Sequence, residues 1–61
     1  MKEGDLVRMI QPYFGGKVGD LGIITETRMV DNIAIYYEIF FIKTNKRSLK
    51  CHGMFELVEE N

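Results

Sequence analysis

Residues 33–42 read IAIYYEIFFI, and this stretch decides the fold of the 61-residue chain. It is rich in β-branched and aromatic residues, which are typical of strands and are weaker helix formers than unbranched residues. Nowhere in the chain do apolar residues recur at the 3.6-residue spacing of an amphipathic helix. We therefore predict a strand over residues 33–43 and an all-β fold.

Both faces of this predicted strand are apolar. The odd-numbered residues of 33–41 fill one face, whereas the other face carries Tyr36, Phe40 and Ile42, with Glu38 as its only charge. A half-solvated antiparallel strand usually alternates apolar and polar residues, so something must cover the second face.

The sequence is compatible with two alternatives for what packs against that second face. The chain covers it itself if Tyr13 and Phe14 fold over from a loop, or if a bulge exchanges the faces midway. Alternatively another chain covers it, and Tyr36, Phe40 and Ile42 then form a partner-binding surface. We predict a protein partner or a second copy of the chain at this surface, because a domain this small has little surplus stability and identical chains most often pair about a two-fold axis.

Short β-favouring runs and turn residues divide the rest of the chain. We predict further strands over residues 6–10, 21–30, 47–51 and 56–59. Between the first two lies the segment 11–20, which contains Pro12 and three glycines. That density of turn residues ends any regular element, so we expect a long loop after the first strand.

Three short turns join the remaining strands. Asp31-Asn32 suits a hairpin because both residues tolerate the left-handed conformation, and residues 44–46 form a second turn. Gly53 with Met54-Phe55 indicates one turn of tight helix before the last strand. Five strands in such a meander cannot cover both faces as an open sheet, so we predict one small barrel domain spanning residues 1–61.

Several motifs occur in a familiar order along the chain. They are GDLVR at residues 4–8, the glycine-rich loop, GIITE at 22–26, YEIFF at 37–41 and ELVE at 56–59. Together they resemble the small SH3-like barrel proteins that tailed bacteriophages commonly encode. The resemblance implies an SH3-like five-stranded barrel, a viral origin and a location in the host cytoplasm. In addition, GKVGDL at residues 16–21 is similar to a KOW segment, which contacts RNA or a protein partner in some ribosomal proteins and transcription elongation factors.

Composition and charge narrow the classes of function. Eight Lys and Arg stand against nine Asp and Glu, and 46% of the residues are apolar, which is typical of a folded domain. The apolar stretch at 33–42 is too short for a membrane helix, and the first residues lead into no signal-like segment. We expect no contact with membranes and a cytoplasmic protein.

Cys51 and His52 are the only residues of their kinds, so the chain can form no internal disulfide and offers no convergent set of metal ligands. Because neighbours on a strand point to opposite faces, we expect a buried thiol beside a surface imidazole. A lone thiol fits a reducing compartment. The loop glycines lack the Lys-Ser or Lys-Thr and the following helix of a phosphate-binding loop. We therefore predict a non-enzymatic protein without a metal, a cofactor or a small-molecule substrate.

The densest charge lies on the hairpin at residues 43–50, where four cations and no acid fall within eight residues. The cations are Lys43, Lys46, Arg47 and Lys50. With Tyr36 and Phe40 on the preceding strand, they would place cations beside stacking rings, the combination that binds single-stranded nucleic acid. Nucleic-acid binding by a KOW-like protein is therefore the alternative to protein binding. A solvated hairpin whose lysines protect a sheet edge is a third interpretation.

Overall fold

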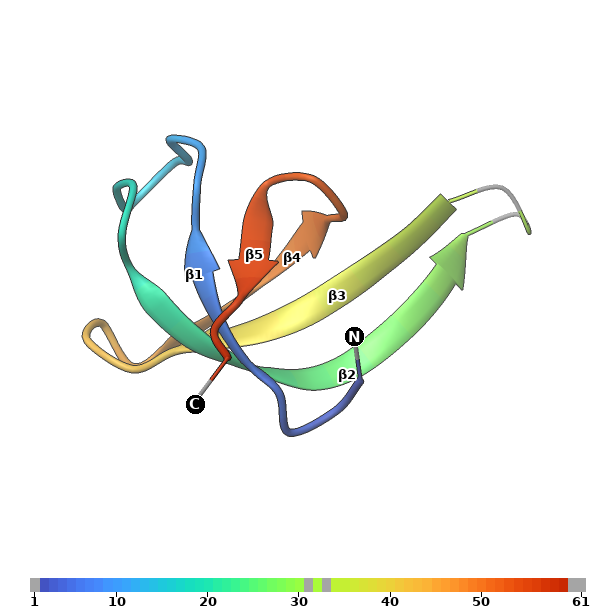
Figure 1. Ribbon diagram of the computed structural model, residues 1–61. Helices are drawn as coiled ribbons and strands as arrows, with labels where there is room; N and C mark the ends of the chain where they lie inside the picture. The colour runs from blue at the N-terminus through green and yellow to red at the C-terminus, as the bar shows by residue number, and fades with distance from the viewer. Residues whose placement is uncertain (1, 31, 33, 60–61) are drawn as a thin grey trace.

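The computed structural model describes residues 2–30, 32 and 34–59, which form a single antiparallel sheet (Figure 1). Its strands are β1 (Leu6–Met9), β2 (Leu21–Val30), β3 (Ala34–Phe41), β4 (Lys46–Cys51) and β5 (Phe55–Leu57). The strand order is β4-β3-β2-β1-β5, and every neighbouring pair is antiparallel. The predictions of an all-β fold and of five antiparallel strands are confirmed. None of the described segments is a helix of the length and apolarity that a bilayer span requires.

The sheet is bent, and β2 and β3 curve along their length (Figure 1). Its edge strands are β4 and β5, which are not paired with each other in the described part of the chain. The sheet is therefore open, and hydrogen bonds do not close it into the predicted barrel.

One face of the sheet carries the core, and we call it the inner face. Its buried residues are Val7, Met9, Ile24, Tyr37, Ile39, Phe41 and Phe55. Tyr37 meets Phe55 edge to face, with ring centroids 5.5 Å apart, and this contact joins β3 to β5 across the inner face. The predicted burial of the odd-numbered side of β3 is confirmed at Tyr37, Ile39 and Phe41. Ile35, on the same side, lies beyond the core and is 45% exposed.

A β-bulge in β2 changes the expected alternation of that strand. Ile24 pairs with Ile39 and Glu26 with Glu38, so Thr25 is the extra residue. The extra residue shifts the parity, which places Glu26 on the same face as Ile23 and opposite Ile24. Strict alternation of faces therefore does not run through the whole of β2, because it holds only in an unbulged ladder.

The turn between β3 and β4 begins two residues earlier than predicted and ends one residue earlier. β3 ends at Phe41 and β4 begins at Lys46, so Ile42 and Lys43 belong to the turn rather than to the strand. Asn45 takes the left-handed conformation, with φ 58°, and its backbone N–H donates to the Phe41 carbonyl at 2.9 Å. The short side chain of asparagine tolerates this conformation, which fixes the end of the turn.

The predicted turn of tight helix at Met54-Phe55 is also wrong, because Phe55 is the first residue of β5 and pairs with Met9. The chain reverses instead through a β-turn in which the Met54 N–H donates to the Cys51 carbonyl at 3.3 Å. Gly53 supplies the positive φ of 103° in that turn.

In the predicted turn at Asp31-Asn32, Asn32 has the expected left-handed φ of 56°. Asp31 lies outside the described residues, as does Ile33 at the predicted start of the following strand.

Gly22 lets β2 and β3 pack closely on the inner face. A Cβ atom at this position would lie 2.4 Å from Cγ2 of Ile39 and 3.0 Å from the Phe40 carbonyl oxygen. Ile39 is completely buried, so its methyl group has no free space to move into. A side chain at residue 22 would therefore overpack the core.

We expect Gly22→Ala to destabilise the fold by about 1–3 kcal/mol, because it forces a methyl group against Ile39. The free energy of unfolding is measured in urea for four proteins: the wild type, Gly22→Ala, Ile39→Leu and the double variant. Leucine lacks the Cγ2 branch, so Gly22→Ala should cost less in the Ile39→Leu background than alone. An equal loss in both backgrounds would show that the clash with Ile39 is not the cause.

Candidate functional site

The face opposite the core, which we call the outer face, carries a cluster of apolar side chains. The strand register places Leu6 of β1, Ile23 of β2 and Phe40 of β3 in one row across the sheet. We define the outer apolar patch as this row together with its neighbours: Leu6, Leu21, Ile23, Phe40, Ile42 and Leu49. Leu6 and Phe40 are half-buried, and the other four are exposed.

The loop after β1 does not cover this patch. Tyr13 packs on the inner face, where its ring stacks on Phe41 with centroids 4.9 Å apart and planes at 17°. Phe14 is fully exposed. The sequence allowed Tyr13 and Phe14 to pack over the outer face, and this geometry contradicts that alternative. The bulge lies in β2 and leaves the faces of β3 unchanged.

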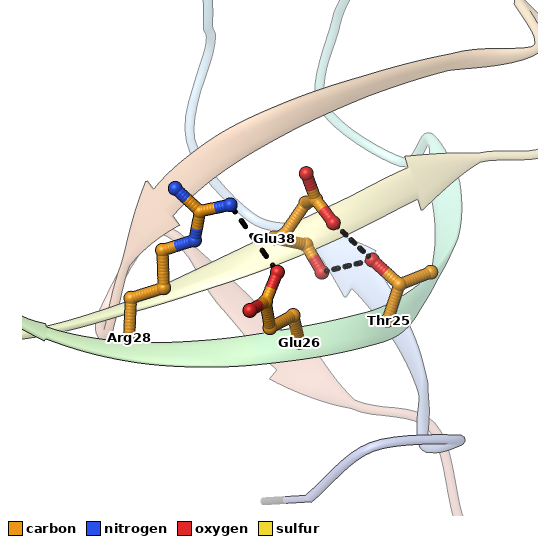
Figure 2. A network of polar contacts seen from close by, with 4 residues as sticks. All are labelled: Thr25, Glu26, Arg28 and Glu38. Atoms are coloured by element: carbon orange, nitrogen blue, oxygen red, sulfur yellow. Dashed lines mark hydrogen bonds and ion pairs between the residues drawn. The ribbon is translucent and has the colours of Figure 1, made fainter.

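The predicted partner surface of Tyr36, Phe40 and Ile42 is divided by a polar network (Figure 2). Thr25 Oγ1 lies 2.9 Å from Oε2 of Glu38 and 3.1 Å from its carbonyl oxygen. Arg28 Nη2 donates to Oε2 of Glu26 at 3.2 Å. Because Glu38 lies between Tyr36 and Phe40 on β3, these charged groups separate the two rings.

Tyr36 therefore lies outside the outer apolar patch, at its polar end. It pairs with Arg28 on one side and with Cys51 on the other. Phe40 is in the patch as predicted. Its neighbours there include Ile23 and Leu49, which the sequence analysis did not identify because strand register cannot be read from a single strand.

Ile42 lies just after β3 and is 50% exposed, and its N–H donates to the Leu21 carbonyl at 3.2 Å. With Val18 and Leu21 it lines a hollow of about 370 Å³, which Lys17 and Lys43 also line. The outer apolar patch thus continues into a concave end with two cations beside it. The KOW-like residues 17–21 form one wall of this hollow.

The segment between β1 and β2 is held by Tyr13. Its hydroxyl donates to Oδ2 of Asp20 at 2.6 Å, and the Lys17 N–H donates to the same oxygen at 3.1 Å. Lys50 Nζ lies 4.6 Å from the Tyr13 ring centroid, within the range of a cation–π contact. Gly16 leaves room for the ring, since a Cβ there would lie 2.0 Å from Cζ of Tyr13.

These contacts shift the pKa values of Tyr13 and Asp20. Partial burial, together with the hydrogen bond to Asp20 and its negative charge, raises the pKa of Tyr13 to about 12. The hydroxyl of Tyr13 and the Lys17 N–H hold the pKa of Asp20 below its ordinary value of 3.8. The loop is therefore fastened by an ionised carboxylate and a neutral phenol throughout the neutral pH range.

A second hollow, of about 200 Å³, lies between this loop and the β3–β4 hairpin. We call it the aromatic groove, and it is lined mainly by Tyr13, Phe14, Phe41, Lys46, Arg47 and Ser48. The sequence analysis placed Tyr36 and Phe40 beside the hairpin cations. For Tyr36 that placement is wrong, because Tyr36 does not line the groove. Of the three rings that line it with Lys46 and Arg47, Tyr13 and Phe14 come from the loop after β1 and Phe41 comes from β3.

The four predicted nucleic-acid-binding cations do not share one surface. The register places Lys46 and Lys50 on the inner side of β4, opposite Phe41 and Tyr37, and Arg47 on the outer side, opposite Phe40. Lys43 lies in the turn and lines the other hollow. The structure therefore brings Lys46 and Arg47 to the aromatic groove and leaves Lys43 elsewhere.

Cys51 and His52 do not point to opposite faces of a strand, one buried and one exposed, as expected. Cys51 is the last residue of β4 and is exposed, and His52 follows in the turn and is also exposed. The prediction of a buried thiol is therefore wrong, because the strand ends at this residue. Among the described residues, no three Cys, His, Asp or Glu side chains gather as metal ligands.

Comparisons with known proteins return no match to a protein-family model, a curated protein or a solved structure.

We expect Asp20→Asn to lower stability at neutral pH but not in acid. Because the pKa of Asp20 is lower in the folded state, its charge stabilises the fold above about pH 4, and this contribution is lost as the pH falls through the folded pKa. Urea unfolding should therefore give a lower free energy of unfolding for the variant than for the wild type at about pH 7. At about pH 2.5 this difference in free energy should disappear.

In a Tyr13→Phe background, Asp20→Asn should lower the free energy of unfolding at neutral pH by less, because the strongest hydrogen-bond donor to Asp20 is gone. A difference between wild type and Asp20→Asn of the same size at both pH values would mean that the charge of Asp20 does not stabilise the loop.

Proposed function

We propose that this protein is a non-enzymatic binding module that associates with a second copy of itself through the outer apolar patch. The observation that carries the proposal is the set of four exposed apolar side chains, Leu21, Ile23, Ile42 and Leu49, gathered on one sheet face beside Phe40. Contiguous exposed apolar surface of this kind is typical of protein interaction sites.

The charges on the outer face favour a second copy as the occupant. Register and ion pairs place three arginines and three glutamates there: Arg8, Arg28 and Arg47 with Glu26, Glu38 and Glu56. The face thus carries both signs of charge, and two of its arginines pair with its own glutamates, whereas a face of one sign would repel its own copy. A two-fold pairing also adds burial to a domain whose core is a single layer of seven residues.

Face-to-face contact fits this sheet better than pairing of strand edges. The edge strand β4 carries Lys46, Arg47 and Lys50 along three of its six residues. Such cations on an edge oppose the addition of another strand. The opposite edge, β5, is only three residues long and presents a short ladder.

The resemblance to phage-encoded SH3-like barrels belongs to the same proposal. The strand order, in which β1 to β4 follow one another and β5 returns to pair with β1, and the bent sheet support a partly open SH3-like barrel. A phage origin would place the protein in the host cytoplasm. A module that binds by an apolar sheet face needs neither a metal nor a cofactor.

Leu49→Glu should convert a wild-type dimer into a monomer, because it places a charge in the contact. The matched control is Ile35→Glu, since Leu49 is 47% exposed on the outer side of β4 and Ile35 is 45% exposed on the inner side of β3. Sedimentation equilibrium should give twice the 7.1 kDa chain mass for the wild type and the control. A monomeric wild type at high concentration would exclude self-association, and a dimeric Leu49→Glu would place the contact elsewhere.

A further inference from the structure

Phe14 is a fully exposed aromatic side chain on a loop that is fixed in place. Its neighbour Tyr13 stacks on Phe41 and donates to Asp20, and the Gly16 N–H donates to the Tyr13 carbonyl at 3.2 Å. The Gly19 N–H donates to the Met9 carbonyl at 2.8 Å, and the Met9 N–H donates to the Asp20 carbonyl at 2.9 Å, which ties the far end of the loop to β1. The loop therefore presents the Phe14 ring to solvent without contributing it to the core.

The groove beside Phe14 is positively charged. Lys46 and Arg47 line it, and Lys50 lies over the Tyr13 ring. The ion pairs among the described residues, Arg8 with Glu56 and Arg28 with Glu26, involve none of these three cations. The nearest acid on the loop, Asp20, already accepts hydrogen bonds from Tyr13 and Lys17.

The shape of the groove fits a segment of a longer chain. Its volume of about 200 Å³ is below that of sites that enclose a free small ligand, which hold about 300–1,000 Å³. The hydroxyl-bearing residues Thr44 and Ser48 also line it, beside the two cations. The groove thus places two cations and two hydroxyl-bearing residues beside the exposed Phe14 ring.

We propose that the aromatic groove binds single-stranded nucleic acid, with a base stacked on Phe14 and the flanking phosphates held by Lys46 and Arg47. An unpaired base exposes the flat surface that an aromatic ring stacks on, whereas the bases of a duplex are already stacked on one another. The net charge of −1 does not oppose this, because none of the acids that the structure describes lines the groove. An acidic polypeptide would meet the same cations but would supply no base, which allows an experiment to separate the two.

The experiment measures fluorescence anisotropy of labelled single-stranded DNA and RNA, about 12 nucleotides long, across a series of salt concentrations. Phe14→Ala should weaken binding by about 5- to 100-fold, the effect of losing one stacked base. Its control is Met29→Ala, which removes another exposed apolar side chain at the far end of β2. Both variants should keep the wild-type unfolding midpoint, because neither side chain is in the core.

Lys46→Glu should weaken binding and reduce the slope of log K against log salt by about 0.7, the contribution of one phosphate contact to a single strand. Lys2→Glu, the same charge change near the amino terminus, should change affinity less. Phe14 and Lys46 are outside the outer apolar patch, so these two variants leave the proposed dimer contact unchanged.

An oligonucleotide of the same length without bases, a duplex and a polyglutamate peptide complete the experiment. The proposal expects the single strand to bind more tightly than all three, with only its binding sensitive to Phe14→Ala. It is overturned if the wild type does not bind the single strand, if Phe14→Ala binds like the wild type, or if the baseless chain or the duplex binds as tightly. Polyglutamate binding that is as tight and as sensitive to Phe14→Ala would make an acidic polypeptide the occupant instead.

Discussion

The stacking of Tyr13 on Phe41 determines what both faces of this sheet present. The ring closes over the inner face at a centroid distance of 4.9 Å, and the hydroxyl reaches Asp20 at 2.6 Å. Because Tyr13 is used there, the loop cannot also cover the outer face, and Phe14 is directed to solvent. The uncovered outer apolar patch and the aromatic groove are therefore two consequences of one packing contact.

A single sheet explains why one face stays uncovered in the described part of the chain. A single layer of strands has two sides, and a domain of this size buries only a limited share of its surface. Here the buried residues all lie on the inner face, where Met54 and Tyr13 pack against them. The exposed side chains of Leu21, Ile23 and Leu49 thus lie on the side of the sheet that the other described residues do not cover.

Sequence reasoning located the strands well and the tertiary contacts poorly, for identifiable reasons. The bounds of β2 at Leu21 and Val30 and the buried parity of β3 follow from local patterns of apolar residues. The bulge at Thr25 leaves no such pattern, since one extra residue changes parity without changing composition.

The candidate surfaces were harder to predict than the strands, because their members come from elements distant in sequence. Phe40 was identified from its own strand, but Ile23 and Leu49 join it only through strand register. Covering of the outer face by Tyr13 and Phe14 was one of the alternatives that the sequence left open, because the side of the sheet on which a loop packs depends on contacts such as that between Tyr13 and Phe41.

Overall charge is a poor guide to the electrostatics of this protein. The chain carries one net negative charge, which argues against nucleic-acid binding when it is taken as an average. Charges on a protein surface are screened over about 8 Å at physiological salt, so a ligand in the groove responds to Lys46 and Arg47 and only weakly to distant acids. On the outer face, by contrast, Arg8 with Glu56 and Arg28 with Glu26 neutralise each other in pairs. The same composition therefore gives one face that carries both signs of charge and one groove that suits an anion.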